Sequence, residues 1–270
     1  MHDININMKF SVALATFNEE ENLAKCLESV IRWTDEIVIV DGGSTDKTLN
    51  IARKFNARII HADNPPIFHI NKQKAIAACR GKWILQLDAD EIVTDELKRE
   101  IISIARTNLA KSKIYGYYVP RKNYFLGSWL KKGGLYPDYV IRFFKNEHGF
   151  FPSRSVHEQI NIEGPVSYLQ NPLIHNTAPT LASYWIKARR YITLRANEYL
   201  ESKNPVNMAS YIYNFIIAPA GLFISLVIRH KAILDGWRGV LFSFYSALQI
   251  PMAYYRYLNI LSRHLKSGYV

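Results

Sequence analysis

The chain has 270 residues, which is enough for one large domain or for a domain with an appendage. Hydrophobic residues make up 49% and charged residues 21%, a composition that excludes an intrinsically disordered chain. The net charge of +11 favours an anionic partner. Because the sequence contains no long Lys/Arg run and no nucleic-acid-binding signature, we expect a phosphorylated substrate or anionic lipid and no nucleic acid.

The N-terminal segment and the two cysteines set the cellular context that we expect. Residues 1–9 are polar and lead straight into a strand, so we expect no signal peptide. Cys26 and Cys79 lack the spacing of metal ligands. We interpret both as small buried apolar residues of a protein in a reducing compartment.

Strands and helices alternate over the first 110 or so residues. The spacing of apolar residues predicts strands over 10–15, 36–40, 57–61 and 82–87, and helices over 18–33, 45–55, 71–79 and 94–110. This order predicts the α/β class, with a doubly wound and mostly parallel sheet. Ligands of such sheets bind outside the carboxyl ends of the strands.

The pattern changes after residue 114. Residues 115–171 are rich in Tyr, Phe, Gly, Lys and Arg, with short strand-like runs, and we predict a mixed β region on the acceptor side of the site. Lys131-Lys132-Gly133-Gly134 is interpreted as a mobile acceptor loop. A basic helix over 183–200 and a linker over 203–207 follow. We therefore expect one domain over 1–203, divided into a donor half (about 1–114) and an acceptor half (about 115–203), and a helical region over 204–270.

The last sixty or so residues contain two uncharged runs, 211–228 and 239–255. Both are marginal for a spanning helix, which needs roughly 20 apolar residues, and Pro219 and Pro251 interrupt them. Aromatic and basic residues at the ends of the runs suit a membrane interface. We expect membrane attachment without a span; two spanning helices, a buried helical hairpin or a dimer contact are the alternatives.

Acidic residues follow the predicted strands. Asp41 ends the second strand, and Asp88 and Asp90 come directly after the fourth. Two carboxylates so placed can hold Mg²⁺ or Mn²⁺ against a diphosphate, because these ions prefer hard oxygen ligands. A solvated turn is the alternative for the Asp-x-Asp pair, and a turn or helix cap is the alternative for Asp41. Three polar strand ends in this order indicate an enzyme that handles a nucleotide-sugar.

The motifs at these strand ends resemble those of the family 2 glycosyltransferases, which have the GT-A fold. The resemblance is carried by segments 15–20, 40–46 and 87–91, and by the later motifs Tyr136-Pro137-Asp138, Arg142-Phe143-Phe144, Val156-His157-Glu158 and Asp235-Gly236-Trp237. The resemblance covers nearly the whole chain. Within the family, the chain resembles the lipopolysaccharide-core β-glucosyltransferase type.

The resemblance implies a role for each matching position. The residues implied to bind the nucleotide-sugar are Thr16, Asn18, Glu19, Asp41, Lys72 and Asp88. Among them Asp41 would contact the base, expected to be uracil, and Asp88 would lie near the ribose and diphosphate. Asp90 would ligate the metal together with Asp88. Gln73 stands where many members have Asn, which leaves the local contacts open.

Family members invert the anomeric centre by direct displacement, which needs one carboxylate as general base. Glu158 is our first choice for the base and Asp138 its competitor, with a salt bridge to Arg as the structural alternative for Glu158. His157 would orient Glu158 or bind the acceptor. His175 would be an additional metal ligand or, alternatively, a hydrogen-bonded structural histidine.

These expectations combine into a metal-dependent inverting glycosyltransferase. It would move a hexose, expected to be glucose, from a UDP-sugar to a lipopolysaccharide-core or lipid-linked saccharide acceptor. It would act as a peripheral or monotopic protein at the cytoplasmic face of the inner (plasma) membrane, and its C-terminal region could form a homo-oligomer. Transfer to polyprenyl phosphate or to a capsule or protein glycan is the alternative within the enzyme class. A catalytically silent, nucleotide-sugar-binding membrane scaffold is the alternative from another class.

Overall fold

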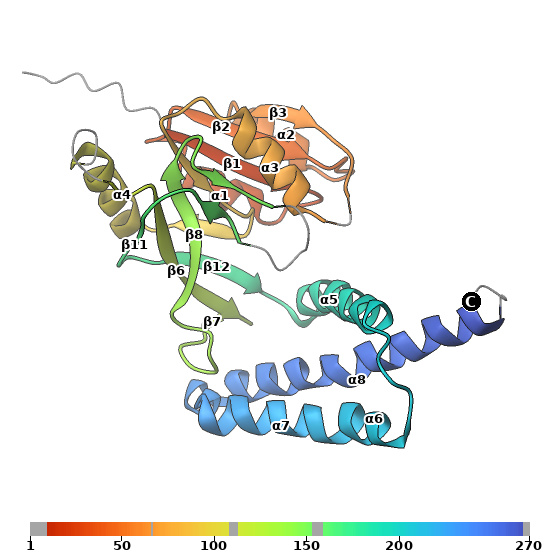
Figure 1. Ribbon diagram of the computed structural model, residues 1–270. Helices are drawn as coiled ribbons and strands as arrows, with labels where there is room; N and C mark the ends of the chain where they lie inside the picture. Colours follow the sequence, from red (N-terminus) through yellow and green to blue (C-terminus); the bar gives the residue numbers. More distant parts are fainter. Residues whose placement is uncertain (1–9, 66, 108–112, 153–158, 267–270) are drawn as a thin grey trace, which may run out of the picture. The chain divides into compact units, whose positions relative to one another are not determined.

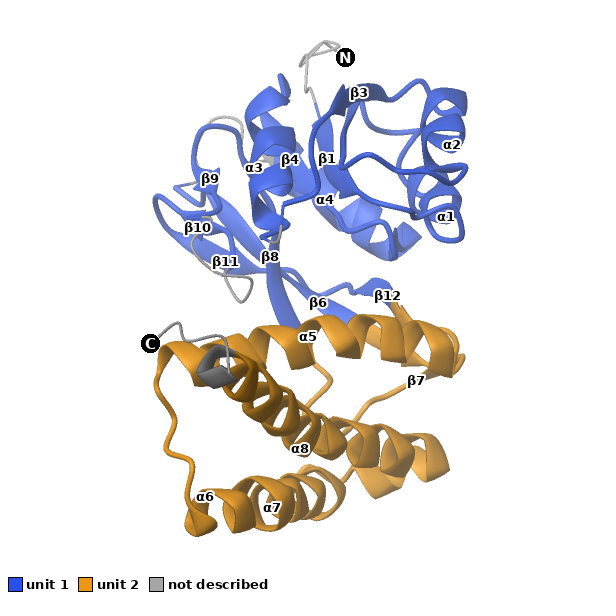
Figure 2. Cartoon of the chain, turned by 90° about the vertical axis from the view of Figure 1, so that its right-hand side faces the viewer, with its two compact units in different colours: residues 1–121, 138–175 blue, residues 122–137, 176–270 orange. Residues whose placement is uncertain are grey.

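The computed structural model describes residues 10–65, 67–107, 113–152 and 159–266 (Figure 1). The chain divides into two compact units (Figure 2). The first unit comprises residues 1–121 and 138–175, and the second comprises residues 122–137 and 176–270. The domain boundary expected at 203–204 stays a prediction.

The first unit is built on a sheet whose N-terminal part is parallel. Its strands are β1 (Phe10–Thr16), β2 (Glu36–Asp41), β3 (Arg58–His61) and β4 (Trp83–Gln86), in the spatial order β3-β2-β1-β4. The order doubles back at β1, which confirms the predicted doubly wound α/β sheet. The register pairs Thr16 with Asp41, so the β1 and β2 loops leave the sheet side by side.

The sheet continues with strands of mixed direction. They are β5 (Glu91–Val93), β6 (Gly116–Phe125), β8 (Asp138–Lys145), β11 (Val166–Tyr168) and β12 (Leu173–Ala178). β8 runs antiparallel to both β4 and β6, and β12 runs antiparallel to β5. A separate small sheet joins β9 (Gly149–Phe150) and β10 (Asn161–Ile162). The predicted mixed β region is confirmed.

Four helices connect these strands: α1 (Leu23–Glu28), α2 (Thr48–Lys54), α3 (His69–Ala78) and α4 (Asp95–Thr107). α1 begins five residues later than predicted because Asn18 adopts a left-handed conformation, with φ of 53°. The Asn18 side chain accepts a hydrogen bond from Thr45 N in the next loop instead of capping a helix. Likewise α2 begins at Thr48 and not at the predicted residue 45, and the Ser44 hydroxyl accepts a hydrogen bond from Asn18 N in the loop before the helix.

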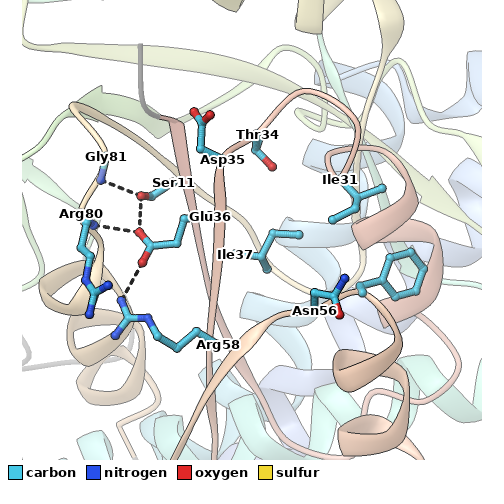
Figure 3. Close-up of a pocket in the computed structure, with 11 residues that line it drawn as sticks. Ser11, Ile31, Thr34, Asp35, Glu36, Ile37, Asn56, Arg58, Arg80 and Gly81 are labelled. Carbon is cyan, nitrogen blue, oxygen red and sulfur yellow. Dashed lines mark hydrogen bonds and ion pairs between the residues drawn. The ribbon is translucent and has the colours of Figure 1, made fainter. Parts of the chain in front are cut away.

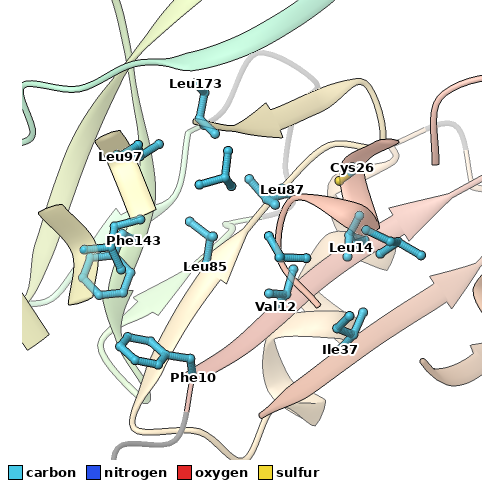
Figure 4. Close-up of a cluster of buried hydrophobic side chains, with 14 of the residues drawn as sticks. Phe10, Val12, Leu14, Cys26, Ile37, Leu85, Leu87, Leu97, Phe143 and Leu173 are labelled. Atoms are coloured by element: carbon cyan, nitrogen blue, oxygen red, sulfur yellow. The ribbon is translucent and has the colours of Figure 1, made fainter. Parts of the chain in front are cut away.

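The core of this unit fills both faces of the parallel strands. Along β1, Phe10, Val12 and Leu14 face the cluster shown in Figure 4. Ala13 faces a second cluster that includes residues of α3. Burial on both faces explains the uninterrupted apolar strands. It also fixes where each strand ends, and therefore where the polar residues emerge. Cys26 and Cys79 are buried free thiols, as predicted.

The second unit is mostly helical. It contains β7 (Ser128–Trp129), α5 (Leu181–Glu201), α6 (Met208–Ile212), α7 (Ala218–Ile224) and α8 (Gly236–Lys266), with π-helical turns at Tyr213–Ile217 and Ser225–Arg229 and a 3₁₀ turn at Ala232–Asp235. The predicted helical C-terminal region is therefore confirmed. Neither proline ends its helix: α8 continues through Pro251, and Pro219 lies in the first turn of α7.

Residues Met208–Arg229 form one continuous helix across α6, α7 and the π-helical turns. Over the part of the chain that the structure describes, it alone is long and apolar enough to cross a membrane. It has 22 residues and a mean hydropathy of 1.9, and 6% of its apolar window is buried.

Candidate functional site

The loops that follow β1 and β2 are joined by side-chain hydrogen bonds. Thr16 Oγ1 donates to Asp41 Oδ1 over 3.1 Å. Asn18 Oδ1 accepts from Thr45 N over 2.8 Å, and Asn18 N donates to Ser44 Oγ over 2.9 Å. Three residues that we predicted to line the nucleotide pocket therefore lie together at the carboxyl ends of adjacent parallel strands. Their contact with a nucleotide stays a prediction.

Asp41 is fully buried and organises the loop after β2. Its Oδ2 accepts from Gly43 N over 3.0 Å and from Ser44 N over 2.8 Å, and its Oδ1 accepts from Ser44 Oγ over 2.6 Å. Gly43 has φ of +83°, a conformation that glycine adopts without strain. The turn-forming role left open for Asp41 is the one seen in this structure.

Glu19 links the first loop to α2 through its backbone. Its N–H donates to Thr48 Oγ1 over 2.7 Å, and its carboxylate accepts from Asn22 Nδ2 over 2.9 Å. The side chain is therefore held at the entry to α1, near the other residues of the two loops.

Asp88, at the carboxyl end of β4, lies between two buried cations. Lys72 Nζ from α3 pairs with Oδ1, and Arg142 Nη2 from β8 pairs with Oδ2 at 2.7 Å. Burial favours the neutral acid, but Arg142 and Lys72 outweigh it and hold the pKa of Asp88 well below its usual range. Asp88 is therefore ionised. Burial lowers the pKa of Lys72, and the charge of Asp88 opposes that shift.

Glu91 is fully buried beneath this pair and binds two arginines. Its Oε1 accepts from Arg142 Nη2 at 2.8 Å and lies 3.4 Å from Arg121 Nη1. Its Oε2 accepts from Asp88 N over 3.0 Å, so Glu91 fixes the backbone that carries Asp88. Sequence reasoning gave Glu91, Arg121 and Arg142 no role. The available signal was a single charge, Arg142, inside the apolar run Val140–Phe144.

Asp138, the alternative general base, forms a two-point ion pair with Arg121. Its Oδ2 accepts from Arg121 Nη2 over 2.7 Å and from Nε over 3.0 Å. Its side chain is 32% exposed, so the carboxylate keeps access to solvent. Glu158 and His157 lie outside the described residues, and their roles stay predictions.

Asp90 and His175 form the second polar pair of the site. His175 Nε2 lies 3.4 Å from Asp90 Oδ2, and both side chains are largely buried. The antiparallel pairing of β12 with β5 brings them together, because His175 stands opposite Glu91 in the register.

Asp90 and His175 suit a divalent cation that takes only some of its ligands from the protein and the others from a substrate. Both oxygens of Asp88 already face cations, whereas Asp90 and His175 offer one carboxylate and one imidazole. Over the described ranges no group of three metal-binding side chains occurs. Substrate phosphates and water would therefore have to complete the coordination, as is usual for Mg²⁺.

Cys26 adjoins the site but is chemically inert there. Its Sγ lies 3.6 Å from the Asp88 carbonyl oxygen. Burial, then the neighbouring Glu91, Asp90 and Asp88 charges, raise the pKa of the thiol well above its usual value. The thiol stays protonated and unreactive.

A cavity lies at the amino ends of the parallel strands, opposite to the acidic loops, and its polar residues have a structural role (Figure 3). Glu36 is the centre of its hydrogen bonds and accepts from Ser11 Oγ, Arg80 N and Arg58 Nη2 at 2.6–2.9 Å. These bonds tie the starts of β1, β2 and β3 together, far along the strands from the acidic loops.

Comparison with known proteins identifies several similar chains. The sequence model of the family described as "Glycosyl transferase family 2" matches residues 11–162, more than half of the chain. The lipopolysaccharide core biosynthesis glycosyltransferase LpsC of Rhizobium meliloti is 29% identical over 261 residues, covering 90% of this chain and 92% of that protein.

Two solved structures are similar at lower identity. S. aureus TarS 1-349 in complex with UDP is 15% identical, covers 97% of this chain and 92% of its own, and has a TM-score of 0.47. Glucosyl-3-phosphoglycerate synthase from Mycobacterium tuberculosis in complex with Mn²⁺, UDP and phosphoglyceric acid is 16% identical, with coverages of 74% and 81% and a TM-score of 0.45.

Proposed function

The chain belongs to glycosyl transferase family 2, and from this premise we propose that it transfers a hexose, expected to be glucose, from a UDP-sugar to a lipopolysaccharide-core or lipid-linked saccharide acceptor. The observation that carries the proposal is the polar edge at the carboxyl end of β4. There Asp88 and Asp90 stand beside Lys72, Arg142 and His175.

Asp90 and His175 would hold a divalent cation, Mg²⁺ or Mn²⁺, which would supply positive charge to the departing diphosphate. Their pairing at 3.4 Å and their burial support this assignment. Asp88 would lie beside the ribose and diphosphate, ionised and held by Arg142. Lys72 would donate one of its three ammonium hydrogens to the diphosphate while it maintains its ion pair with Asp88.

Transfer with inversion requires a base on the side of the sugar opposite to the diphosphate. The acceptor oxygen would bond to the anomeric carbon as the bond to the diphosphate breaks, and its proton would pass to a carboxylate. Glu158 is the proposed base. Asp138, which forms an ion pair with Arg121 at 2.7 Å, is the second choice.

Features outside the proposed donor site support the proposed acceptor and location. The relative LpsC, named for lipopolysaccharide core biosynthesis, aligns over nearly the full length of both chains. The exposed apolar helix Met208–Arg229 and the net charge of +11 support attachment to an anionic surface. The proposed location is the cytoplasmic face of the inner (plasma) membrane, with peripheral or monotopic attachment.

A thermal-shift screen of the full-length protein tests the donor site. The ligands are UDP-, GDP-, dTDP- and CMP-sugars, each with and without Mn²⁺. We expect a selective shift by UDP-sugars that needs Mn²⁺, since a ligand that binds only the folded state stabilises it. Asp90→Asn should abolish the metal-dependent part, whereas Glu28→Gln, which removes one exposed charge from α1, should keep it. A shift common to all four nucleotides, or one that survives Asp90→Asn, would contradict the proposal.

A further inference from the structure

An aromatic and cationic cluster is formed by the end of β6 and by the segment between β6 and β8, which includes β7. Lys122 Nζ lies 4.6 Å and Lys131 Nζ 4.9 Å from the centre of the Trp129 ring. Tyr136 packs edge-on against the same ring, with centroids 5.0 Å apart. The Trp129 N–H is buried and meets no acceptor among the described residues. Two ammonium groups on one indole concentrate positive charge, and this favours an anion beside the ring.

The segment between β6 and β8 is anchored by its backbone, and the side chains of Lys131 and Lys132 are exposed. Lys132 N donates to Asp235 Oδ2 over 2.8 Å, and Gly133 N donates to the His230 carbonyl over 2.8 Å. Gly133 has φ of +68°, and a Cβ there would lie 3.3 Å from Ala232 Cβ. The glycine therefore permits a close approach that holds the loop against the turn 229–236.

This turn also ends the apolar helix Met208–Arg229 and is itself basic. Residues 122–137 and 229–238 together contain six Lys or Arg residues and one acidic residue, Asp235. The Asp235 carboxylate accepts the Lys132 N–H and tethers the loop. An aromatic ring, a concentration of positive charge and the end of an apolar helix thus meet within the second unit.

We propose that this loop–turn cluster is an acceptor subsite for the phosphorylated saccharide headgroup of an amphiphilic molecule. The proposal rests on the proposed function and specifies the acceptor class. Lysine binds phosphate as a point charge, and an ammonium over a ring keeps donors for a second partner. The Trp129 N–H is a hydrogen-bond donor for a sugar oxygen, and the Tyr136 ring suits the apolar side of a sugar ring. The helix that ends at the turn suits the lipid part of the same molecule.

The test measures binding of a soluble headgroup to the full-length protein. The probe is deacylated lipopolysaccharide core oligosaccharide, used intact and after removal of its phosphates with hydrofluoric acid. Titration is followed by calorimetry and by tryptophan fluorescence. We expect the intact oligosaccharide to bind about tenfold or more tightly than the dephosphorylated one, since each charge-assisted contact contributes at the level of tenfold in affinity.

Variants assign the effect to the cluster. The double change Lys122→Gln and Lys131→Gln should weaken binding of the intact oligosaccharide about tenfold and leave the dephosphorylated one unaffected. Lys145→Gln is the matched control, because Lys145 stacks on Tyr115 at 4.7 Å in the first unit. Trp129→Phe should weaken binding of both oligosaccharides. Equal affinity of wild-type protein for the two oligosaccharides, absence of binding, or an equal loss in the control would overturn the proposal.

Two further measurements, of vesicle binding and of the donor thermal shift, separate the subsite from bilayer contact and from failure of the proposed function. If the double variant loses affinity for vesicles containing anionic phospholipid and keeps its affinity for the oligosaccharide, the lysines contact the bilayer and the subsite is refuted. The donor thermal shift is measured on the same samples and should be unchanged in the double variant. Phosphate-dependent binding without any UDP-sugar shift would support the subsite and refute the proposed function, so the two failures are distinguishable.

Discussion

At the residue scale, the polar edge at the carboxyl end of β4 depends on a buried ionic network in which Glu91 has the central position. Glu91 has no solvent exposure, yet it contacts Arg142, Arg121 and the backbone of Asp88. Charges removed from water this completely persist only when each is paired. The network therefore constrains Asp88 more tightly than a surface carboxylate could be constrained.

Replacing Glu91 by Gln tests this dependence. The change leaves Arg142 and Arg121 with one anion fewer in a dry environment, and we expect it to lower the free energy of unfolding by about 3 kcal/mol. Glu96→Gln removes an ion-paired carboxylate from the exposed pair with Arg99 and should change stability by less than about 1 kcal/mol. Urea unfolding followed by circular dichroism measures both. Equal effects of the two substitutions would show that the buried network adds no stability.

The sequence predicted the acidic residues of the site better than their partners. Asp41, Asp88 and Asp90 were found because a polar residue at the end of an apolar strand is a local pattern. Arg142, which had been given no role, reaches the same edge through the antiparallel pairing of β8 with β4. His175 was named only through the family resemblance, and the antiparallel pairing of β12 with β5 brings it to Asp90. Those pairings join segments more than fifty residues apart, and no local periodicity encodes them.

At the element scale, the predicted helices were found, and the differences arise where a side chain serves a neighbouring loop. Asn18 was expected to begin α1, but its amide binds the loop before α2, and the helix begins at Leu23. In the C-terminal runs the prolines were expected to interrupt the helices. Instead, Pro219 lies inside the continuous helix Met208–Arg229, just after the π-helical turn Tyr213–Ile217, and α8 continues through Pro251.

Two glycines in the C-terminal helices allow a matched test of helix packing. A Cβ at Gly239 of α8 would lie 2.0 Å from the Ala232 carbonyl oxygen, whereas one at Gly221 of α7 would meet nothing within 4 Å. Gly221→Ala should stabilise the protein by about 0.5–1 kcal/mol through helix propensity. Gly239→Ala should destabilise it by about 1–3 kcal/mol, because backbone must move. Thermal unfolding of both variants measures the difference, and a gain in stability at Gly239 would show that α8 does not pack on this turn.

At the scale of the whole molecule, the chain combines an α/β unit that has a buried core on both faces of its sheet with a helical unit that leaves much apolar surface uncovered. The helix Met208–Arg229 carries exposed residues such as Ile216 and Ile224, at 62% and 55% exposure. A water-soluble monomer rarely exposes such a continuous apolar face. The basic residues at its C-terminal turn suit the headgroup layer of an anionic bilayer.

We therefore expect Ile216→Asp to release the protein from anionic vesicles in a co-sedimentation assay. A charged residue in the middle of a membrane-embedded helix costs roughly 3 kcal/mol, which corresponds to about a hundredfold loss in partitioning. Ile186→Asp is the control, because Ile186 is 70% exposed on α5, outside the apolar helix. If a second copy of the chain covers the helix instead of lipid, Ile216→Asp will lower the molar mass measured by light scattering, and neither variant will change vesicle binding. The two measurements together decide whether lipid or protein covers the apolar helix.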